Sequence, residues 1–372
     1  MSIRPTVKRP KIDYILALCV FILVLFGLVM ISSASVVTSF EKFGSNFHYL
    51  NQQLVSLGIG IVVWLIATNI DYRFYQKHSI WFLIISILLL VVVFIPGIGA
   101  SFGGAKRWIH FGPVPFQPSE VVKLTFIIYL ACWLDKQGKE ITSFIKGFLP
   151  FILLVLFICG LIVIQPDMGT MSIIFLTAVV MYFTAGASWS HLSLTVIFTG
   201  ILGAILIRFE SYRMARFLTF FSPEKATLTA NYHILQAMLA IGSGGLWGLG
   251  FGQSRQKYLY LPQAHSDSIF AIIAEELGFI RAGLVVALFA FIGMRGFAIA
   301  KNAPDRFSQL LSVGLTSWIL IQVFINLFAM LGIIPLTGVP LPFISAGGSS
   351  LVVTLAAVGI LLNISKHIQH AR

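Results

Sequence analysis

Apolar runs of about twenty residues recur along the whole chain, and they limit the possible folds more than any other feature. Hydrophobic residues make up 58% of the 372 residues and charged residues only 10%, which is too little polarity for the surface of a soluble domain. The runs are continuous and do not alternate between apolar and polar residues, which argues against a β-barrel. We therefore expect an all-α polytopic membrane protein.

Matching the apolar runs to the thickness of a bilayer predicts about ten membrane-spanning helices. They are expected at residues 13–35, 50–69, 79–98, 119–134, 147–165, 168–186, 190–208, 267–293, 307–330 and 349–365. The first run is too long for a signal peptide and has no obvious small-residue cleavage site, so it is kept as a span. We expect a single membrane domain over residues 13–365, with short tails at 1–12 and 366–372.

Lysine and arginine residues indicate which loops face the cytoplasm. They precede the first expected span, lie between the second and third, and follow the fourth, eighth and tenth: Arg4, Lys8, Arg9, Lys11, Arg73, Lys77, Lys136, Lys139, Lys146, Arg295, Lys301, Arg306, Lys366 and Arg372. With ten spans all of these fall on one side, so both termini are expected in the cytoplasm. Contact of these loops with anionic membrane lipid accounts for the net charge of +12, and nucleic acid is not expected as a partner.

Three segments rich in glycine and proline are left for the outer side, at 99–118, 209–266 and 331–348. The second is a large loop between the seventh and eighth spans. Two of the segments carry basic residues: Lys106, Arg107, Arg213, Arg216, Arg255 and Lys257. These can be ordinary solvated loop charges. The alternative is a site for phosphate or pyrophosphate, because cations lie beside backbone N–H groups that glycine leaves accessible.

Ionisable residues at membrane depth usually face a partner or a cavity. Glu120 and Lys123 are three residues apart on one helix, the spacing of a local ion pair. Asp167 lies in the connection QPDMGT, and Glu275 and Glu276 lie inside the eighth span. Each can belong to a structural pair. Their concentration toward the outer side favours a shared site.

Asp267 lies in the polar stretch YLPQAHSDSIF, at residues 260–270 between apolar runs. One explanation is structural, because an acid at the start of a helix is stabilised by the helix dipole and Ser266 or His265 can cap the helix. The other is catalytic, because partial desolvation raises the pKa of a carboxylate toward the range of a useful general base. Arg281, deeper in the same span, is expected to pair with Glu275 or Glu276 or to face water.

Several familiar site patterns are missing from the sequence. The three cysteines, Cys19, Cys132 and Cys159, lie in apolar runs and suggest neither disulfides nor a metal cluster. The stretch GSGGLWGLGFG at residues 242–252 lacks the Lys-Ser/Thr pair of a phosphate-binding loop. A tightly packed or re-entrant turn is expected there instead.

Four blocks together resemble one family: GAKRWIHFGPVPFQPSEVVKL, QPDMGT, YHILQAMLAIGSGGLWGLGFGQSRQKYLYLPQAHSDSIFAIIAEELGF and PLTGVPLPFISAGGSS. They look like the signature segments of the SEDS proteins (shape, elongation, division and sporulation), in the right order and over nearly the whole chain. The stretches SRQKYLYLP, PLPFISAGGSS and MISSAS look more like the division and sporulation branch (FtsW and SpoVE type) than the elongation branch (RodA type).

The resemblance implies a ten-span peptidoglycan glycosyltransferase in the bacterial cytoplasmic membrane. Such proteins polymerise lipid II into glycan strands on the outer face and work with a class B penicillin-binding protein and other division proteins. The family's essential loop aspartate falls on Asp267. Other family positions of functional weight are matched by Lys106, Arg107, Glu120, Lys123, Asp167, Gln236, Lys257 and Ser349. The chain departs mildly from the pattern at Gln263, Ser266, Ser268 and Arg281.

The residues and the resemblance lead to one mechanistic hypothesis. Asp267 is expected to take a proton from the acceptor sugar while polyprenyl pyrophosphate leaves the donor. Lys106, Arg107, Arg255 and Lys257 are expected to stabilise the leaving group, and the chemistry allows help from a divalent cation such as Mg²⁺ or Mn²⁺, whose ligands the sequence does not identify. A lipid II flippase and a non-enzymatic division scaffold are the alternatives, because many spans and buried charges also suit a transporter.

Overall fold

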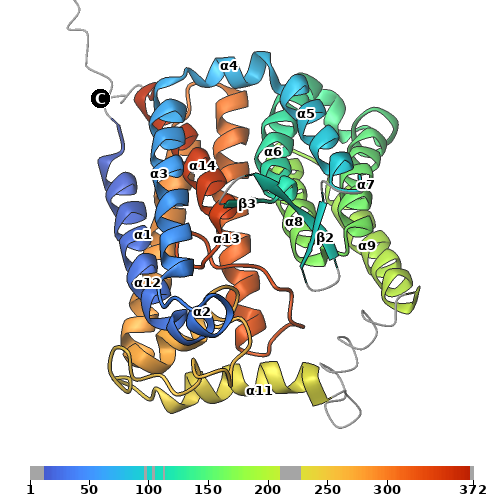
Figure 1. Ribbon diagram of the computed structural model, residues 1–372. Coiled ribbons are helices and arrows are strands. Elements are labelled where there is room, and N and C mark those ends of the chain that lie inside the picture. Colours follow the sequence, from blue (N-terminus) through green and yellow to red (C-terminus); the bar gives the residue numbers. More distant parts are fainter. Residues whose placement is uncertain (1–11, 96–98, 103–104, 112–113, 210–227, 369–372) are drawn as a thin grey trace, which may run out of the picture.

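The computed structural model describes residues 12–95, 99–102, 105–111, 114–209 and 228–368 (Figure 1). Several basic residues of the sequence analysis lie outside these ranges: Arg4, Lys8, Arg9, Lys11, Arg213, Arg216 and Arg372.

A helix lies at each of the ten ranges where a span was predicted. These helices are α1 (Tyr14–Ala34), α3 (His48–Asn69), α5 (Ser79–Val92), α6 (Pro118–Gln137), α7 (Leu149–Ile164), α8 (Met168–Thr184), α9 (Trp189–Phe209), α12 (Ile269–Lys301), α13 (Arg306–Met330) and α14 (Gly348–Lys366). Within the described residues, six helices are long and apolar enough to cross a membrane: α1, α3, α12, α13, α14 and α7 with the π-helical turn before it. The chain is therefore a multi-pass membrane protein, and the number of crossings stays a prediction.

Four further features interrupt the predicted pattern. The helices α2 (Val36–Phe43), α4 (Tyr72–Lys77) and α11 (Leu228–Ser243) are additional to it. The strands β1 (Gly99–Phe102), β2 (Ala105–Phe111) and β3 (Val114–Phe116) form an antiparallel sheet in the order β1-β2-β3. An all-α protein was expected, and the sheet was missed because its strands of three to seven residues are shorter than the runs that reveal spans.

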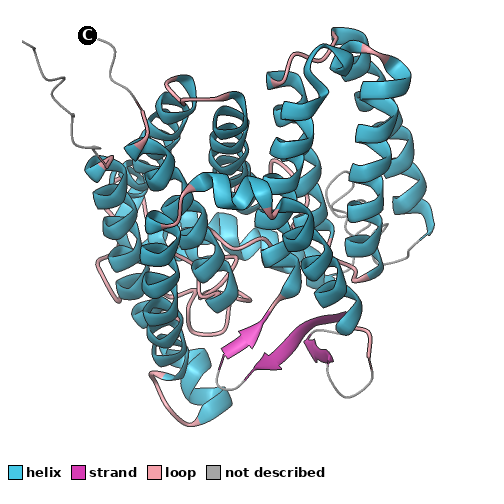
Figure 2. Cartoon of the chain, turned by 90° about the horizontal axis from the view of Figure 1, so that it is seen from above, coloured by secondary structure: helices cyan, strands magenta, loops and turns pink. Residues whose placement is uncertain are grey.

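The helices form a bundle whose two ends differ (Figure 1). One end carries α4 and the C-terminal end of α14, and we call it the α4 end. The opposite end carries α2 and α11, and we call it the α11 end. Helices α13 and α14 lie in the middle and are buried over most of their length. Seen from above, the small sheet lies at one edge of the bundle (Figure 2).

The packing of α1 against α12 fixes the distance between two polar levels. At the α4 end, Arg295 binds Asp13 with its Nη2 atom 2.7 Å from Oδ2. At the α11 end, the Ser33 hydroxyl donates to Glu276 Oε1 over 2.7 Å. The two levels are about twenty residues apart on both helices, or roughly 30 Å at 1.5 Å per residue, which is the thickness of a bilayer's hydrocarbon core. These contacts therefore mark the two boundaries of the apolar zone.

Helix α12 breaks at Gly278, where φ is 81° and ψ is 173°. The break leaves backbone groups on both sides without their helical partners. Four backbone hydrogen bonds of 2.9 to 3.3 Å satisfy them from the glycine-rich turn: Leu249 N to Glu275 O, Gly250 N to Glu276 O, Phe279 N to Gly245 O and Ile280 N to Leu246 O. The stretch GSGGLWGLGFG is thus a tightly packed turn that completes a broken helix.

Glycine is required where this turn meets the helix. A Cβ atom on Gly278 would lie 2.3 Å from the backbone nitrogen of Gly248, and one on Gly244 would lie 2.0 Å from the carbonyl oxygen of Ala274. Backbone atoms cannot move aside as a flexible side chain can. The positive φ at Gly278 adds a second reason, since residues with a Cβ rarely adopt it.

We predict that Gly278→Ala destabilises the purified protein by roughly 2–4 kcal/mol, from backbone strain together with the clash. The matched control is Gly283→Ala in the same helix, where a Cβ would meet nothing within 4 Å. Thermal unfolding in detergent measures both variants. Melting of Gly278→Ala at the wild-type temperature would contradict the break in α12.

Candidate functional site

Asp267 lies at the α11 end, immediately before α12. The helix begins at Ile269, and Ser268 takes the N-cap position without capping through its side chain. The Ser268 hydroxyl donates instead to the carbonyl oxygen of Pro262 over 3.0 Å. Asp267 therefore lies outside the first helical turn, and the explanation that it serves as a helix-start acid loses its geometric basis.

Three hydrogen bonds hold the backbone around Asp267 in place. Asn326 Nδ2 donates to the carbonyl oxygen of Asp267 over 2.7 Å, and the Ser345 hydroxyl donates to that of Ser266 over 2.6 Å. The N–H of Ala346 donates to the carbonyl oxygen of His265 over 2.9 Å. The position of Asp267 is thus set by α13 and by the chain that follows it.

The Asp267 carboxylate is half-buried beside a glycine of the 337–347 segment, which links α13 to α14. A Cβ atom on Gly338 would lie 3.8 Å from Asp267 Oδ2. The Ser266 hydroxyl donates to Asp267 Oδ1 over 3.0 Å. The carboxylate is therefore oriented by its neighbours and keeps access to the surroundings.

The 337–347 segment is irregular, and side chains satisfy much of its backbone. Two buried amides on α13 reach it: Asn326 Nδ2 donates to Val339 O over 2.8 Å, and Gln322 Nε2 donates to Pro340 O over 3.0 Å. From α3, Gln53 accepts from the N–H of Gly347 over 3.1 Å. Irregular backbone at membrane depth survives only when it is satisfied inside the protein or lines a cavity.

Asp167 caps a helix that also reaches the 337–347 segment. It caps α8, accepting from the backbone N–H and the hydroxyl of Thr170 over 3.1 and 2.9 Å. A Cβ atom on Gly169 would lie 2.5 Å from Val339 Cγ2 and 2.9 Å from the Thr337 carbonyl oxygen. The start of α8, which Asp167 caps, and Asp267 therefore both lie close to residues 337–339.

Ser349 and Arg107 fasten the small sheet to this region. The Ser349 hydroxyl accepts from the N–H of Gln117 and donates to the carbonyl oxygen of Pro115, both over 3.0 Å. Arg107 donates through Nε to the carbonyl oxygen of Gln165 over 2.8 Å and through Nη2 to that of Pro166. Both side chains are engaged with backbone, so their geometry is that of positioning residues.

Glu120 and Lys123 form the buried ion pair that their spacing predicts, with Nζ 2.9 Å from Oε1. Lys123 also donates to Gln322 Oε1 over 3.0 Å and lies 5.2 Å from the centre of the Trp318 ring. The ammonium group thus has three kinds of partner. Glu120 Oε2 is buried and accepts no hydrogen bond from the part of the chain that the structure describes.

Lys257 is buried, and its charge is used inside the protein. Its Nζ lies 3.1 Å from Glu276 Oε1, 3.2 Å from the Ser33 hydroxyl and 2.6 Å from the carbonyl oxygen of Gly252. Neighbouring Glu275 accepts from the backbone N–H of Arg255 over 2.9 Å. The two glutamates therefore act together to hold residues 252–257 on α12, and the Arg255 side chain is exposed.

The remaining predicted residues lie apart from this network. Gln236 is half-buried on α11. Lys106 lies on β2 opposite Ser101, and its side chain is outside the described part. Arg281 was expected to pair with Glu275 or Glu276 or to face water. It pairs with neither glutamate: Glu275 accepts from the Ser254 hydroxyl, and Glu276 pairs with Lys257. The Arg281 side chain is exposed, and Nη1 donates to the Trp247 carbonyl oxygen over 3.3 Å.

His265 is buried next to Asp267 and packs on Tyr49, with 4.1 Å between the ring centres. Burial, and to a lesser degree the charge of Lys42, lowers the pKa of His265 to about 4. The imidazole is therefore neutral at pH 7 and serves as packing. Asp267 is left as the ionisable group of this stretch.

The donors that the structure describes do not fit a resident metal site. Within residues 12–95, 99–102, 105–111, 114–209 and 228–368, no group of three or more His, Cys, Asp or Glu side chains is arranged to hold an ion. Asp167 and Asp267 both lie near residues 337–339, and the described residues add no third ligand of that type. No step of the chemistry is therefore assigned to a bound cation.

Sequence reasoning missed the amides that build the site: the buried Gln53, Gln322 and Asn326, and the half-buried Gln117. A signal was present for two of them, because Gln322 and Asn326 are four residues apart on one helix and share a face.

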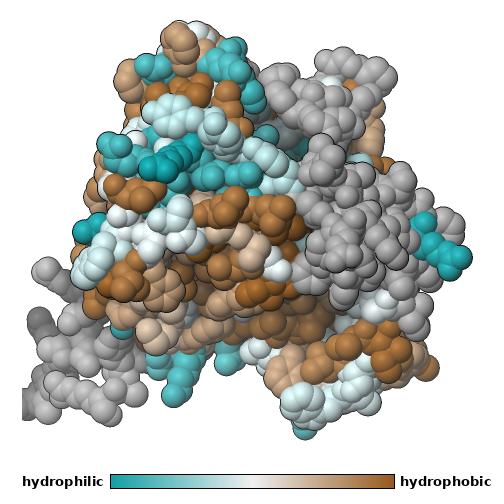
Figure 3. All heavy atoms as spheres, turned by 90° about the horizontal axis from the view of Figure 1, so that it is seen from below, coloured by the Kyte–Doolittle hydropathy of each residue, from teal (hydrophilic) through white to brown (hydrophobic). Residues whose placement is uncertain are grey.

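Seen from below, the α11 end carries a band of hydrophilic side chains beside a broad apolar area (Figure 3). That combination suits a substrate with a polar head and a lipid tail.

Comparison with known proteins gives consistent matches. The model of the FtsW/RodA/SpoVE family, described as cell cycle protein, matches residues 13–370. Stage V sporulation protein E of Bacillus subtilis (strain 168) is 41% identical over 366 residues, covering 97% of this chain and 99% of that protein. A probable peptidoglycan glycosyltransferase FtsW of Geobacter metallireducens is 37% identical over 355 residues, covering 95% of each.

Solved structures show the same fold. A chain from a study of how a peptidoglycan synthase complex coordinates polymerization and crosslinking matches with a TM-score of 0.80 and 26% identity, over 96% of this chain and 98% of that one. The rod shape determining protein RodA of Thermus thermophilus matches with a TM-score of 0.72 and 27% identity, over 97% and 99%.

We predict that Lys257→Met or Glu276→Gln alone destabilises the protein by roughly 3–5 kcal/mol, because each leaves a buried group without its partner. The double variant should lose less than the sum of the two. Thermal unfolding in detergent gives the three values. Lys146→Met is the matched control, since its pair with Glu140 is exposed, and no measurable loss is expected. If the double variant lost the sum of the two single losses in unfolding free energy, Lys257 and Glu276 would not be coupled.

Proposed function

Because the chain belongs to the FtsW/RodA/SpoVE family, we propose that it is a peptidoglycan glycosyltransferase that polymerises lipid II into glycan strands. The observation that carries the proposal is the placement of Asp267. Asn326 fixes the backbone of Asp267, and Ser345 fixes the backbone of its neighbour Ser266. The Asp267 side chain stays half-buried at the α11 end. A fixed, accessible carboxylate is what a general base requires.

In the proposed reaction, Asp267 takes the proton from the 4-hydroxyl of the acceptor sugar. That oxygen forms a bond with the anomeric carbon of the growing chain. The bond from this carbon to the pyrophosphate breaks with inversion, and polyprenyl pyrophosphate leaves with the electron pair. Confinement of two lipid-held substrates at one membrane surface supplies part of the rate, because both reactants arrive already oriented.

The leaving group gains charge in the transition state, so cations fixed near it accelerate the reaction. Among the proposed pyrophosphate residues, Arg255 best suits direct contact, because its side chain is exposed at the α11 end. Lys106 is retained as a second contact. Arg107, Lys123 and Lys257 are engaged within the protein, and we assign them to positioning.

Four other residues of the site are given supporting roles. Asp167 and Ser349 position the 337–347 segment and the sheet around the substrate. Glu120 holds Lys123 in place, and its buried Oε2, which accepts no hydrogen bond from the described residues, is assigned to a water. Half-buried Gln236 is assigned to the approach along α11. None of these roles involves bond making or breaking.

We propose that the ten helices of the predicted spans all cross the cytoplasmic membrane, with the α11 end outside. The loop over 209–266 is then extracytoplasmic, the single membrane domain covers 13–365, and the tails 1–12 and 366–372 are cytoplasmic. The basic residues Arg73, Lys139 and Lys301 support this orientation, because the positive-inside rule favours them in cytoplasmic connections. We also propose that the protein acts at the division septum, because the relatives that it resembles are named FtsW and stage V sporulation protein E.

A class B penicillin-binding protein is the proposed transpeptidase partner, together with other division proteins. The support is the similarity to a chain of a peptidoglycan synthase complex that coordinates polymerization and crosslinking. Lipid II and the growing glycan strand are the proposed substrates. A flippase or a scaffold would share the fold, so the test has to detect polymer.

We predict that Asp267→Asn lowers polymerisation of externally added lipid II at least a hundredfold, because loss of a general base costs roughly 10²–10⁴ in rate. Purified protein is assayed by gel separation of the glycan products, with the partner transpeptidase present. Glu41→Gln, which removes an exposed carboxylate from α2, is the matched control and should polymerise normally. An unchanged rate for Asp267→Asn would reject the base assignment. Movement of labelled lipid II across liposomes without any polymer would favour a flippase.

A further inference from the structure

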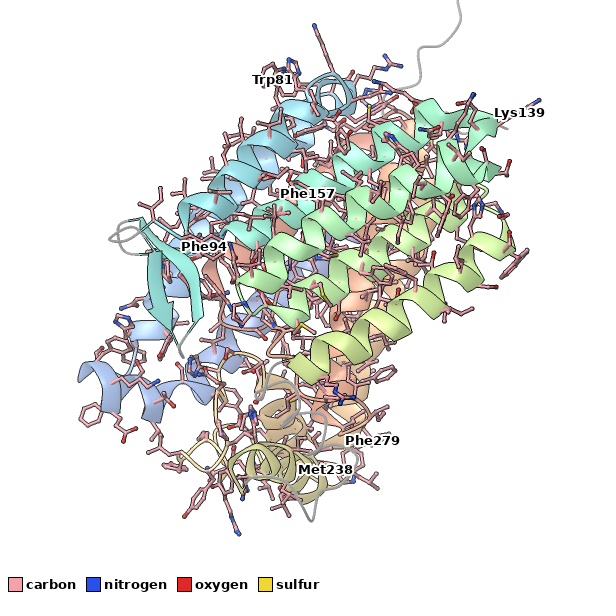
Figure 4. The ribbon with its side chains drawn as sticks, turned by 90° about the vertical axis from the view of Figure 1, so that its right-hand side faces the viewer. Trp81, Phe94, Lys139, Phe157, Met238 and Phe279 are labelled. Carbon is pink, nitrogen blue, oxygen red and sulfur yellow. The ribbon has the colours of Figure 1, made fainter. Side chains whose placement is uncertain are left out.

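Arg281 is a cation on an apolar, outward-facing surface. On α12, Phe279 is 71% exposed and Leu284 is 65% exposed, and from the glycine-rich turn Trp247 is 68% exposed. Figure 4 shows Phe279 pointing outward near the α11 end. In a multi-pass membrane protein such a surface contacts lipid, where an isolated charge is costly unless it reaches a polar partner.

The depth of Arg281 places that partner at the outer boundary of the bilayer. Glu276 marks the outer polar level, and Arg281 follows it by five residues, or roughly 7 Å along the helix. An arginine side chain can bury its stem in the apolar zone and return its charged head to the interface. The hydrogen bond from Nη1 to the Trp247 carbonyl oxygen holds the head beside this turn, which spans the break at Gly278 and is itself bonded to Glu275 and Glu276 through the N–H groups of Leu249 and Gly250.

The guanidinium group has donors to spare. It carries five N–H groups. Within the described ranges one of them is used, in the hydrogen bond to the Trp247 carbonyl oxygen. No carboxylate among those residues forms an ion pair with it, since the ion pairs there involve other cations. The remaining fork of donors suits a tetrahedral anion with oxygens on one face, which is the geometry of a phosphate.

We propose that Arg281 and Trp247 form a binding site for the phosphate of an anionic phospholipid in the outer leaflet. Trp247 supplies the amphipathic ring that favours the interface, and Arg281 supplies the charge. Arg281 is 14 residues from Asp267, or roughly 20 Å along the helix, so the ligand is a membrane lipid and not the pyrophosphate at the transfer site. The lipid fixes the glycine-rich turn, and with it the start of α12, at headgroup level.

The test measures which lipid lies next to α12. A Leu284→Cys variant carries a fluorophore one turn below Arg281, and the native cysteines Cys19, Cys132 and Cys159 are buried. The protein is placed in phosphatidylcholine vesicles that contain a minor fraction of either brominated phosphatidylglycerol or brominated phosphatidylcholine. Bromine quenches a fluorophore in contact with it, so the two signals compare the local occupancy of the two lipids.

We predict that phosphatidylglycerol is preferred at this position by about fivefold, the equivalent of ~1 kcal/mol per basic residue near the surface. Arg281→Gln should abolish the preference, and Arg281→Lys should keep most of it. High salt should weaken it. A fluorophore at Phe157→Cys, exposed on α7, is the matched control and should show no effect of Arg281→Gln.

Two outcomes overturn the proposal. Equal quenching by the two brominated lipids, unchanged by Arg281→Gln, means that Arg281 selects no lipid. Quenching by neither lipid means that a second copy of the chain covers this surface. Thermal unfolding of Arg281→Gln should match the parent, because the side chain is exposed and makes one backbone contact. The result does not depend on whether Asp267 acts as a base.

Discussion

The structure depends on how the irregular backbone of residues 337–347 is satisfied in the middle of a helical bundle. A chain without regular secondary structure carries polar groups that lipid cannot satisfy, so the surrounding helices must supply the partners. Asn326, Gln322 and Gln53 do so with buried amides from α13 and α3. The segment is therefore rigid although it is irregular, and rigidity is what allows it to organise a site.

Two acidic residues owe their positions to this segment. Asp267 lies against Gly338, and Asp167 caps the helix whose Gly169 touches Thr337 and Val339. The break in α12 serves the same site, because it lets the glycine-rich turn and Lys257 bind at Glu275 and Glu276 and so fixes the chain that leads to Asp267. Asp267, the proposed base, thus gains on a loop the precision normally given by regular elements.

Much of the architecture could be predicted from the sequence, because apolar runs report helix positions directly. The ranges of α13 and α14 were predicted to within one residue, and the Glu120–Lys123 pair follows from its spacing. The small sheet was missed, since its strands are too short for a periodic signal. The role of Lys257 and the isolation of Arg281 were also hidden, because both depend on contacts between residues distant in sequence or on which face of a helix meets lipid.

The account rests on Asp267 lying at the outer surface within reach of a lipid-linked sugar. The most direct measurement is the labelling of an Asp267→Cys variant in intact cells with a membrane-impermeant maleimide, since the native cysteines are buried. We expect labelling from outside, and slower labelling when lipid II accumulates. Labelling only after the cytoplasmic side is opened would contradict the account.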